Sequence, residues 1–420
     1  MATREPFEVL VVGAGPGGIA AAIATARHAR VGVVDDNPAP GGQIWRGFSP
    51  SKGDRRAAKL IGLLAESTVT RLFGTQVVAA PEPGLLLAES DGRPIELRYR
   101  KLILATGARE RFLPFPGWTL PNVMGAGGVQ ALVKSGYPVK GKRVIVAGSG
   151  PLLLSVAEYL QRQGATVPFV VEQAPWSRVA AFGAKLAWLN FGKLLQGINY
   201  RMALRKTRYA TGCWPIQAHG TSRLESVTFR SGRKTWTEPC DILACGFGLA
   251  PNLELPQLLG CEVRDGAAVV DKWQESTVPG IYCVGEITGI GGWELSWLEG
   301  LIAGLAAVER KDRAGHGFPA RFRHRRFARA LNNAFALRDE LRNLADDDTL
   351  ICRCEDVARG RLAGYASWRA AKLHTRCGMG LCQGRVCGPA AEFLFGWKHE
   401  SIRPPVFPAT AATLAHEKAN

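Results

Sequence analysis

A strand, a glycine-rich turn and a helix open this chain in an order that few folds accommodate. The apolar run 7–12 precedes the turn Gly13-Ala-Gly-Pro-Gly-Gly18, and an alanine-rich stretch follows over 19–27. In such a unit the first glycine makes a tight turn, the second lets the backbone approach a pyrophosphate, and the third allows close packing of helix on strand. Unpaired N–H groups at the helix start can then bind phosphate. The sequence therefore predicts a dinucleotide-binding βαβ unit.

An acidic residue completes this first unit. The next predicted strand, 31–34, ends in Asp35, which lies 22 residues after Gly13. An acid at this spacing can accept hydrogen bonds from a ribose. A glycine-rich turn without a ligand is the alternative interpretation. We expect the dinucleotide to contact Gly13, Gly15, Pro16, Gly18 and Asp35.

A second strand, turn and helix of the same kind begin near residue 142, but with a defect. The turn reads Gly148-Ser-Gly-Pro-Leu-Leu153, so Leu153 stands where the third glycine belongs, and the following strand ends in Glu172. The missing glycine impairs close packing of the helix, while an acid at Glu172 would favour NAD over NADP. A working NAD site and a domain kept for structure or for another adenine nucleotide both remain open, and we favour the second.

Cysteines concentrate near the C-terminus. Five of the ten lie between positions 352 and 387. A tight thiol cluster in a chain without a secretory signal points to a metal. Structural zinc usually takes cysteines two to four residues apart, whereas four cysteines are the normal ligands of a 2Fe-2S cluster. Zinc and fortuitous thiols are the alternatives. We expect Cys352, Cys354, Cys382 and Cys387 as ligands, with Cys377 as a spare thiol.

The chain is strongly basic, with 53 Lys and Arg residues against 36 Asp and Glu and a formal net charge of +17. This balance suits an acidic partner or an anionic membrane surface. No helix-turn-helix, zinc-finger or RNA-recognition signature accompanies it, so we expect no nucleic acid. Basic residues gather over 309–329, where docking on such a partner or surface and a solvated linker are equal alternatives. Without a secretory signal we expect a cytoplasmic protein, peripheral at most to the inner face of the membrane.

Further motifs carry a resemblance to a known family. The segments Ala105-Thr-Gly107, Gly41-Gly-Gln43 and Val284-Gly-Glu286 resemble those of flavoprotein reductases with two dinucleotide-binding domains. The run T-R-C-G-M-G-L-C-Q-G-R-V-C over 375–387 is similar to the bacterioferritin-associated-ferredoxin type of 2Fe-2S domain. That domain is fused to α subunits of the opine oxidase, hydroxyproline dehydrogenase and hydrogen cyanide synthase group, which the chain resembles over nearly its whole length.

The resemblance implies an α/β fold with two Rossmann-like, glutathione-reductase-like domains and a small helical 2Fe-2S domain. It implies that FAD, or another adenine nucleotide, also contacts Gly42, Gln43, Thr106, Gly107, Gly285 and Glu286, where Asp is more usual than Glu286. We expect a discontinuous first domain over 1–138 and 256–310, a second over 139–255, a basic linker and helix over 311–346 with the helix at 325–344, the cluster domain over 347–400, and an extended tail over 401–420.

The resemblance also implies an electron-transfer role in a heteromeric amine or imino-acid dehydrogenase. In that group a β subunit similar to D-amino acid oxidases oxidises the substrate, so we name no catalytic residue in this chain. A small ferredoxin-like γ subunit, an FMN at a subunit interface and an acceptor in the membrane are further expectations, and NAD stays uncertain. The alternatives are a stand-alone NADH-dependent reductase and a zinc-holding scaffold.

Overall fold

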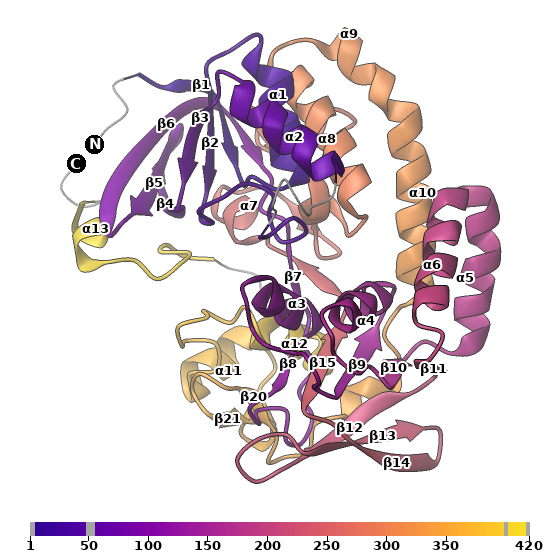
Figure 1. Cartoon of the computed structure of the whole chain (residues 1–420). Helices are drawn as coiled ribbons and strands as arrows, with labels where there is room; N and C mark the ends of the chain where they lie inside the picture. The colour runs from indigo at the N-terminus through magenta and orange to yellow at the C-terminus, as the bar shows by residue number, and fades with distance from the viewer. Residues whose placement is uncertain (1–4, 48–54, 399–401, 417–420) are drawn as a thin grey trace. The chain divides into compact units, whose positions relative to one another are not determined.

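The computed structural model describes residues 5–47, 55–398 and 402–416. The chain forms two compact units, each built from separate stretches of sequence (Figure 1). The first unit comprises Met1–Arg109, Pro251–Ala328 and Glu400–Asn420, and the second comprises Glu110–Ala250 and Arg329–His399. The α/β fold class predicted from the sequence is confirmed.

A parallel sheet forms the centre of the first unit. Its strand order is β3-β2-β1-β6, with β19 parallel to the far side of β6, while β5 and β4 extend the other half of β6 as an antiparallel ribbon. The inner strands are buried on both faces, as their continuous apolar runs predict. The strands are β1 (Phe7–Val12), β2 (Val31–Asp35), β3 (Thr70–Phe73), β4 (Thr75–Glu82), β5 (Leu85–Ser90), β6 (Arg93–Leu104) and β19 (Ile281–Cys283).

Two helices of the first unit cross at very short range. A Cβ atom added to Gly300 of α8 would lie 2.1 Å from the carbonyl oxygen of Gly17 in α1, and Thr25 donates a hydrogen bond to the Gly304 carbonyl at 3.2 Å. Small residues on both helices therefore set this crossing. The helices of the unit are α1 (Pro16–Ala26), α2 (Arg55–Glu66), α7 (Glu254–Leu258), α8 (Trp293–Ala307), α9 (Lys311–Ala314) and the first part of α10 (Phe318–Ala334), with 3-10 turns η1 (Gly285–Thr288) and η2 (Gly315–Gly317).

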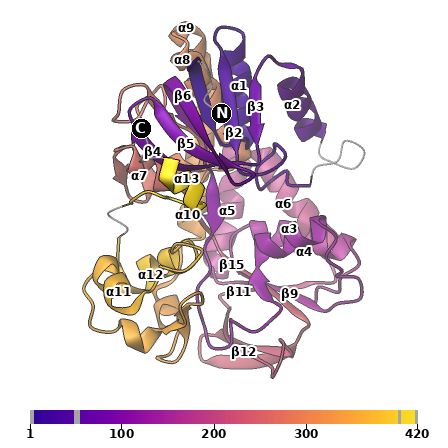
Figure 2. The same cartoon turned by 90° about the vertical axis from the view of Figure 1, so that its left-hand side faces the viewer.

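The second unit repeats the parallel arrangement. Its sheet has the order β11-β10-β9-β15-β8, and an antiparallel sheet of order β12-β13-β14 packs against it in a shared core (Figure 2). The elements are β8 (Val123–Gly125), α3 (Ala126–Lys134), β9 (Val144–Ser149), α4 (Leu152–Arg162), β10 (Phe169–Glu172), α5 (Trp176–Leu189), α6 (Phe191–Ala203), β11 (Arg208–Thr211), β12 (Trp214–His219), β13 (Ser226–Ser231), β14 (Lys234–Pro239) and β15 (Ile242–Phe247). Short strands β7 (Ala108–Glu110), β16 (Leu249–Pro251), β17 (Val263–Arg264) and β18 (Ala267–Ala268) complete the sheet elements of these regions.

The cysteine-rich part belongs to the second unit. The indole N–H of Trp118 donates a 2.7 Å hydrogen bond to the carbonyl of Leu350, and a small core around Ile351 and Trp368 holds the part together. A short hairpin accompanies the helices here, so this part is not purely helical. Its elements are η3 (Asp339–Asn343), β20 (Leu350–Cys352), β21 (Val357–Ala358), η4 (Arg359–Leu362), α11 (Trp368–Thr375) and α12 (Cys387–Phe395).

The structure places the predicted basic helix differently. We expected a linker and then a helix over 325–344, whereas α10 spans Phe318–Ala334. The helix begins earlier because Arg321 and Arg325, one turn apart, are held by buried acceptors, Gln274 and Glu299. It ends earlier because the backbone after Ala334 makes hydrogen bonds with other parts of the second unit.

The tail also differs from the extended segment that we expected. It contains a short helix, α13 (Ala411–His416), and it lies in the first unit. Val406 donates a backbone hydrogen bond to Val78 at 2.8 Å, and Glu89 accepts hydrogen bonds from Thr410 and Thr413.

Among the described residues, no helix combines the length and hydropathy needed to cross a bilayer.

A buried charged group joins α10 to the rest of the first unit. The side chain of Glu299 is 1% exposed and forms an ion pair with Arg325 at 2.8 Å. The same carboxylate accepts hydrogen bonds from Gly285 N at 3.0 Å and from the Thr288 hydroxyl at 2.8 Å. Its removal would take the ion partner from Arg325, which keeps its hydrogen bond to Gln274, and the acceptor from the Gly285 N–H.

We therefore expect Glu299→Ala to lower the free energy of unfolding by about 1–3 kcal/mol, because the Gly285 N–H loses its acceptor and Arg325, which is 35% exposed, loses its ion pair. Urea denaturation of the purified protein measures this change. Glu66→Ala, at the exposed end of α2, is the control and should change stability by no more than about 0.5 kcal/mol. Equal stability of the two variants would show that the buried pair does not hold α10.

Candidate functional site

Two glycines of the first turn are required by packing. Gly13 has a φ of +104°, and a Cβ atom there would lie 2.3 Å from the carbonyl oxygen of Ala105. A Cβ atom on Gly18 would lie 1.8 Å from the carbonyl oxygen of Gly13. The turn, the helix behind it and the neighbouring strand end thus approach one another through backbone atoms, as predicted.

Gly15 is different, because nothing in the fold demands a glycine there. Its φ is −75° and its ψ −176°, which any residue adopts, and the nearest atom to an added Cβ is the Cα of Gly42 at 4.0 Å. Pro16 opens α1, whose N-terminus has no side-chain cap and no acid in its first turn. The space over Gly15 and the free N–H groups beside it therefore fit a pyrophosphate.

An acid and a base lie at the end of β2. Asp35 is buried and accepts hydrogen bonds from the backbone N–H groups of Ala14 and Asn37. Arg46 donates to the Asn37 side chain at 2.7 Å, yet its Nε is buried without a hydrogen-bond partner in the described part of the chain. Such an orphaned donor beside Asp36 fits an anionic ligand. Sequence reasoning missed Arg46, because only the fold of the 41–47 turn directs its side chain.

The three flavin-type motifs lie in the same unit as this turn. Gly41 donates a 2.7 Å backbone hydrogen bond to Ala14, which brings Gly42 against Gly15, while Gln43 is exposed. Val284, just before Gly285, lies 3.4 Å from the position that a Cβ on Gly17 would take.

Hydrogen bonds that involve the backbone hold the motifs at 105–107 and 284–286 in place. Thr106 and Asn252 exchange hydrogen bonds at 2.8 and 2.7 Å, which hold the turn that contains Gly107. Glu286 accepts hydrogen bonds from Gly291 and Gly292, and burial raises the pKa of its carboxyl to about 7. Asn252, far along the chain, had no signal in the sequence.

The second glycine turn is built like the first but is covered by the chain itself. Glu172 is fully buried and accepts hydrogen bonds from Gly150 N at 2.7 Å and Ala174 N at 2.8 Å; burial raises its carboxyl pKa to about 7. Ser149 donates to the carbonyl of Phe335 at 2.9 Å.

The same covering segment contacts the residue after the acid. The amide of Gln173 donates to the carbonyl oxygens of Phe335 and Ala336 at 3.4 and 3.3 Å, and accepts from Arg338 N at 3.3 Å. A nucleotide in a Rossmann half binds at these strand ends. Residues 335–338 thus contact the groups that a nucleotide would face. The missing third glycine has a smaller effect on the site, because Leu153 is buried in the core of the unit.

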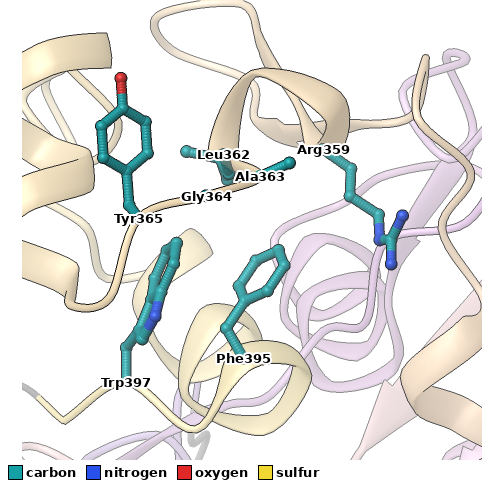
Figure 3. A pocket seen from close by; sticks show the side chains of 7 residues that line it. All are labelled: Arg359, Leu362, Ala363, Gly364, Tyr365, Phe395 and Trp397. Atoms are coloured by element: carbon teal, nitrogen blue, oxygen red, sulfur yellow. The ribbon is translucent and has the colours of Figure 1, made fainter.

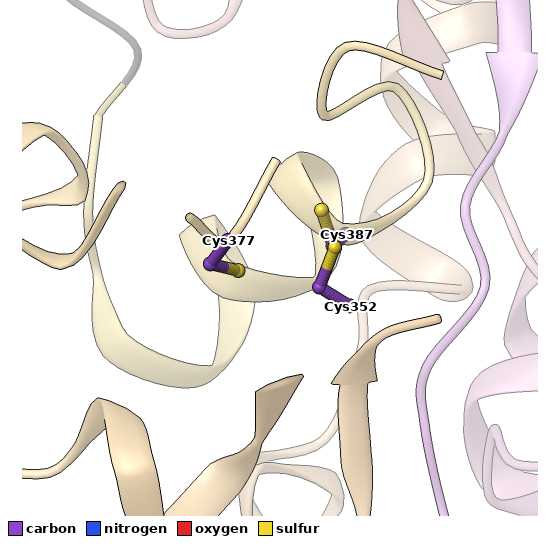
Figure 4. Close-up of side chains that lie close together, drawn as sticks. All are labelled: Cys352, Cys377 and Cys387. Atoms are coloured by element: carbon purple, nitrogen blue, oxygen red, sulfur yellow. The ribbon is translucent and has the colours of Figure 1, made fainter. Parts of the chain in front are cut away.

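All five clustered cysteines come together in the second unit. The sulfurs of Cys352, Cys377 and Cys387 lie within 4.8 Å of one another (Figure 4), and those of Cys354 and Cys382 lie 3.7 Å apart. Contact between Cys382 and Cys387 joins the two groups. The geometry therefore does not separate Cys377 from the four ligands that we predicted.

The surroundings of the sulfurs suit thiolate ligands. The N–H of Gly378 points at the sulfur of Cys352, 3.4 Å away. Contact among the thiols lowers the pKa of Cys352 and Cys382 and raises the pKa of Cys377 and Cys387, so the thiols share protons. Thiolate is the form that binds metals. Cys352 and Cys387 are buried, but Cys354 is exposed, and Leu381, which precedes Cys382 in the chain, is 84% exposed. One edge of the thiol group therefore reaches the surface.

A hollow of about 210 Å³ lies elsewhere in the cysteine-rich part (Figure 3). Phe395 and Trp397 stack against each other on one side of it, with ring centroids 4.4 Å apart. Arg359 on its rim pairs with Asp347 at 2.8 Å. None of the predicted cofactor residues lines this hollow.

Comparison with known proteins agrees with this geometry. Residues 7–302 match the model of the pyridine nucleotide-disulphide oxidoreductase family. An opine oxidase subunit from Agrobacterium tumefaciens is 30% identical, over 98% of this chain and 92% of the relative. Hydrogen cyanide synthase subunit HcnB of Pseudomonas aeruginosa is 33% identical, over 90% of each chain.

Solved structures show the same fold. L-proline dehydrogenase from P. horikoshii superposes with a TM-score of 0.71 at 19% identity, covering 99% of this chain and 80% of the other. Thioredoxin reductase from T. acidophilum gives a TM-score of 0.57 at 19% identity, over 73% of this chain and 99% of the other.

The open space over Gly15 yields a direct test of dinucleotide binding. We expect Gly15→Ala to fold normally but to lose bound dinucleotide at least about tenfold, because the new methyl group fills the space that the pyrophosphate approaches. Gly62→Ala in α2, where an added Cβ meets nothing within 4 Å, is the control.

Released nucleotide per mole of protein, measured after heat denaturation, gives the occupancy, and the far-UV circular dichroism spectrum reports the fold. Wild-type occupancy in Gly15→Ala would mean that the ligand does not approach this turn.

Proposed function

We propose that this chain is an electron-transfer subunit of a heteromeric amine or imino-acid dehydrogenase. The chain belongs to the pyridine nucleotide-disulphide oxidoreductase family and to the group that contains the opine oxidase and hydrogen cyanide synthase subunits. Electrons enter from a partner subunit's flavin and leave to an external acceptor. FAD in the first unit and a 2Fe-2S cluster in the second are the proposed carriers. Such cofactors supply one- and two-electron transfer, and the protein positions them.

The covered second glycine turn carries the proposal. Because Phe335 and Ala336 accept hydrogen bonds from Ser149 and Gln173, NADH would have to displace this segment to bind there. We therefore propose a donor other than a nicotinamide nucleotide. The donor is instead a β subunit similar to D-amino acid oxidases, as the relatives' designation as subunits supports.

The residues around the first turn have binding roles. Gly13, Gly15, Pro16 and Gly18 are proposed to shape the pyrophosphate site, where backbone N–H groups at the start of α1 donate. Asp35 is the proposed ribose contact. Arg46 adds a cation at the same end of β2. The remaining proposed contacts of the flavin half are Gly42, Gln43, Thr106, Gly107, Gly285 and Glu286. An FMN at the subunit interface and a small ferredoxin-like γ subunit belong to the same proposal.

The cluster of five cysteine thiols lies where electrons could enter or leave at the protein surface. Cys354 is exposed, and two apolar side chains, Leu381 and Val386, are exposed at 84% and 44% in the same loop region. A cluster held partly at the surface lets a redox partner approach it, and apolar side chains around it offer contact area. We keep Cys352, Cys354, Cys382 and Cys387 as the proposed ligands.

Cysteine substitutions test the ligand set. We expect Cys354→Ser and Cys382→Ser to lose most iron and acid-labile sulfide, and Cys377→Ser to keep about two iron atoms per chain, because four thiolates complete such a cluster. Cys240→Ser, a buried thiol outside the group, is the matched control.

Metal analysis and the visible spectrum are the measurements. If Cys377→Ser loses iron and Cys354→Ser keeps it, then Cys377 is a ligand in place of Cys354. Zinc without iron in the unsubstituted protein would contradict the electron-transfer role.

Anaerobic reduction tests the function itself. NADH added to the purified chain should leave the flavin absorbance unchanged, because the second turn is covered, whereas dithionite should bleach it. In the complex with its β subunit, an amine or imino acid should reduce the cofactors of both chains. Rapid bleaching by NADH alone, or oxidation of an amine by the isolated chain, would overturn the proposal.

A further inference from the structure

The helical hairpin of α5 and α6 exposes apolar side chains that ordinary packing would bury. The two helices contact each other side by side (Figure 1). Trp188, at the end of α5, is 93% exposed, and Trp176, at its start, is 66% exposed. Isolated exposed apolar residues are common on proteins, but a contiguous group marks an interaction surface.

The exposed residues of α6 form one stripe. Phe191, Leu195, Ile198 and Met202 are between 45% and 67% exposed, and they recur at spacings of four, three and four residues. Residues so spaced share one face of a helix. No residue of α6 is buried. The helix therefore presents its apolar stripe to the outside in the described chain.

Every charged residue in the stretch of chain that holds α5 and α6 is basic, while Glu340, from another part of the second unit, interacts with Arg178 at the start of α5. No Asp or Glu occurs between Glu172 and Glu225, whereas Lys185 on α5 and Arg205 and Lys206 just after α6 are exposed. Arg201 of α6 lies over the ring of Tyr209, 5.4 Å from its centroid. The apolar stripe thus has a wholly basic border within this stretch of chain.

We propose that the exposed faces of α5 and α6 bind the headgroup region of an anionic lipid bilayer. Interfacial helices combine Trp, Phe and Leu on one face with Lys and Arg around it, and they lie in the plane of the membrane. Helices of 14 and 13 residues are too short to span a bilayer, which takes about 20 residues. Lys is depleted at protein interfaces, whereas Lys185 and Lys206 are exposed at the border of this surface, so an anionic lipid surface fits better than a protein partner.

Vesicle sedimentation tests this surface on the full chain with its bound cofactors. The protein should bind vesicles of phosphatidylcholine with about one third phosphatidylglycerol, and bind pure phosphatidylcholine vesicles much more weakly, since anionic lipid attracts basic residues. High salt should weaken binding to the anionic vesicles. Sedimentation of the protein with neither vesicle would overturn the proposal.

Two pairs of substitutions separate the apolar and the basic contributions. Trp188→Ser with Phe191→Ser should lower binding at least about tenfold, because two interfacial aromatic rings are lost. Lys185→Gln with Arg205→Gln should lower it about fivefold for each charge removed. The controls are Leu132→Ser on α3, which is 45% exposed, and Arg233→Gln with Lys234→Gln in an exposed turn; both should bind normally.

Other occupants of the surface give other results. If Trp188→Ser with Phe191→Ser abolishes concentration-dependent self-association and leaves vesicle binding unchanged, the surface joins two copies of the chain. If this variant instead fails to assemble with the β subunit, the surface is a subunit interface. Either result overturns the lipid proposal. The vesicle test does not involve electron transfer, so its outcome is independent of the proposed function.

Discussion

Backbone-to-backbone approach around the first glycine turn is the constraint on which the first unit depends. The carbonyl oxygens of Gly13, Gly17 and Ala105 occupy the space that side chains on Gly18, Gly300 and Gly13 would need. Strand β1, helix α1 and helix α8 can meet only because these positions lack a Cβ. Gly15 and the uncapped N-terminus of α1 belong to the same turn, so the glycines that permit the packing of the unit adjoin the space proposed for a phosphate.

The two Rossmann halves use the same construction to different ends. In each half the acid at the end of the second strand accepts a hydrogen bond from the glycine turn, Asp35 from Ala14 and Glu172 from Gly150. What distinguishes them is the polypeptide that lies on the turn. The second half receives the carbonyl groups of Phe335 and Ala336, which satisfy Ser149 and Gln173 internally. Buried polar groups need partners, and here the chain supplies them where a nucleotide otherwise would.

Charge is arranged by the fold into separate roles. Arg325 of the basic stretch is neutralised by buried Glu299, which also supports the turn at Gly285. Other cations surround the exposed stripe of α6, where no acid of the same stretch opposes them. The basic residues behind the formal net charge of +17 therefore lie in several places and have different roles. It combines structural ion pairs with a surface suited to an anionic partner.

The strands, the glycine turns and the concentration of thiols were readable in the sequence, because each depends on residues close together in the chain. Local spacing determines that Gly13 and Asp35 border one βα unit, and that Cys352 and Cys354 are neighbours. Sequence alone could not place Arg46, Asn252 or Cys377, nor show that 335–338 covers the second turn. It also misjudged the bounds of α10, since the helix forms where Arg321 and Arg325 meet acceptors distant in the chain. Those features depend on which remote segments pack together, and packing energies between remote segments are absent from any local pattern.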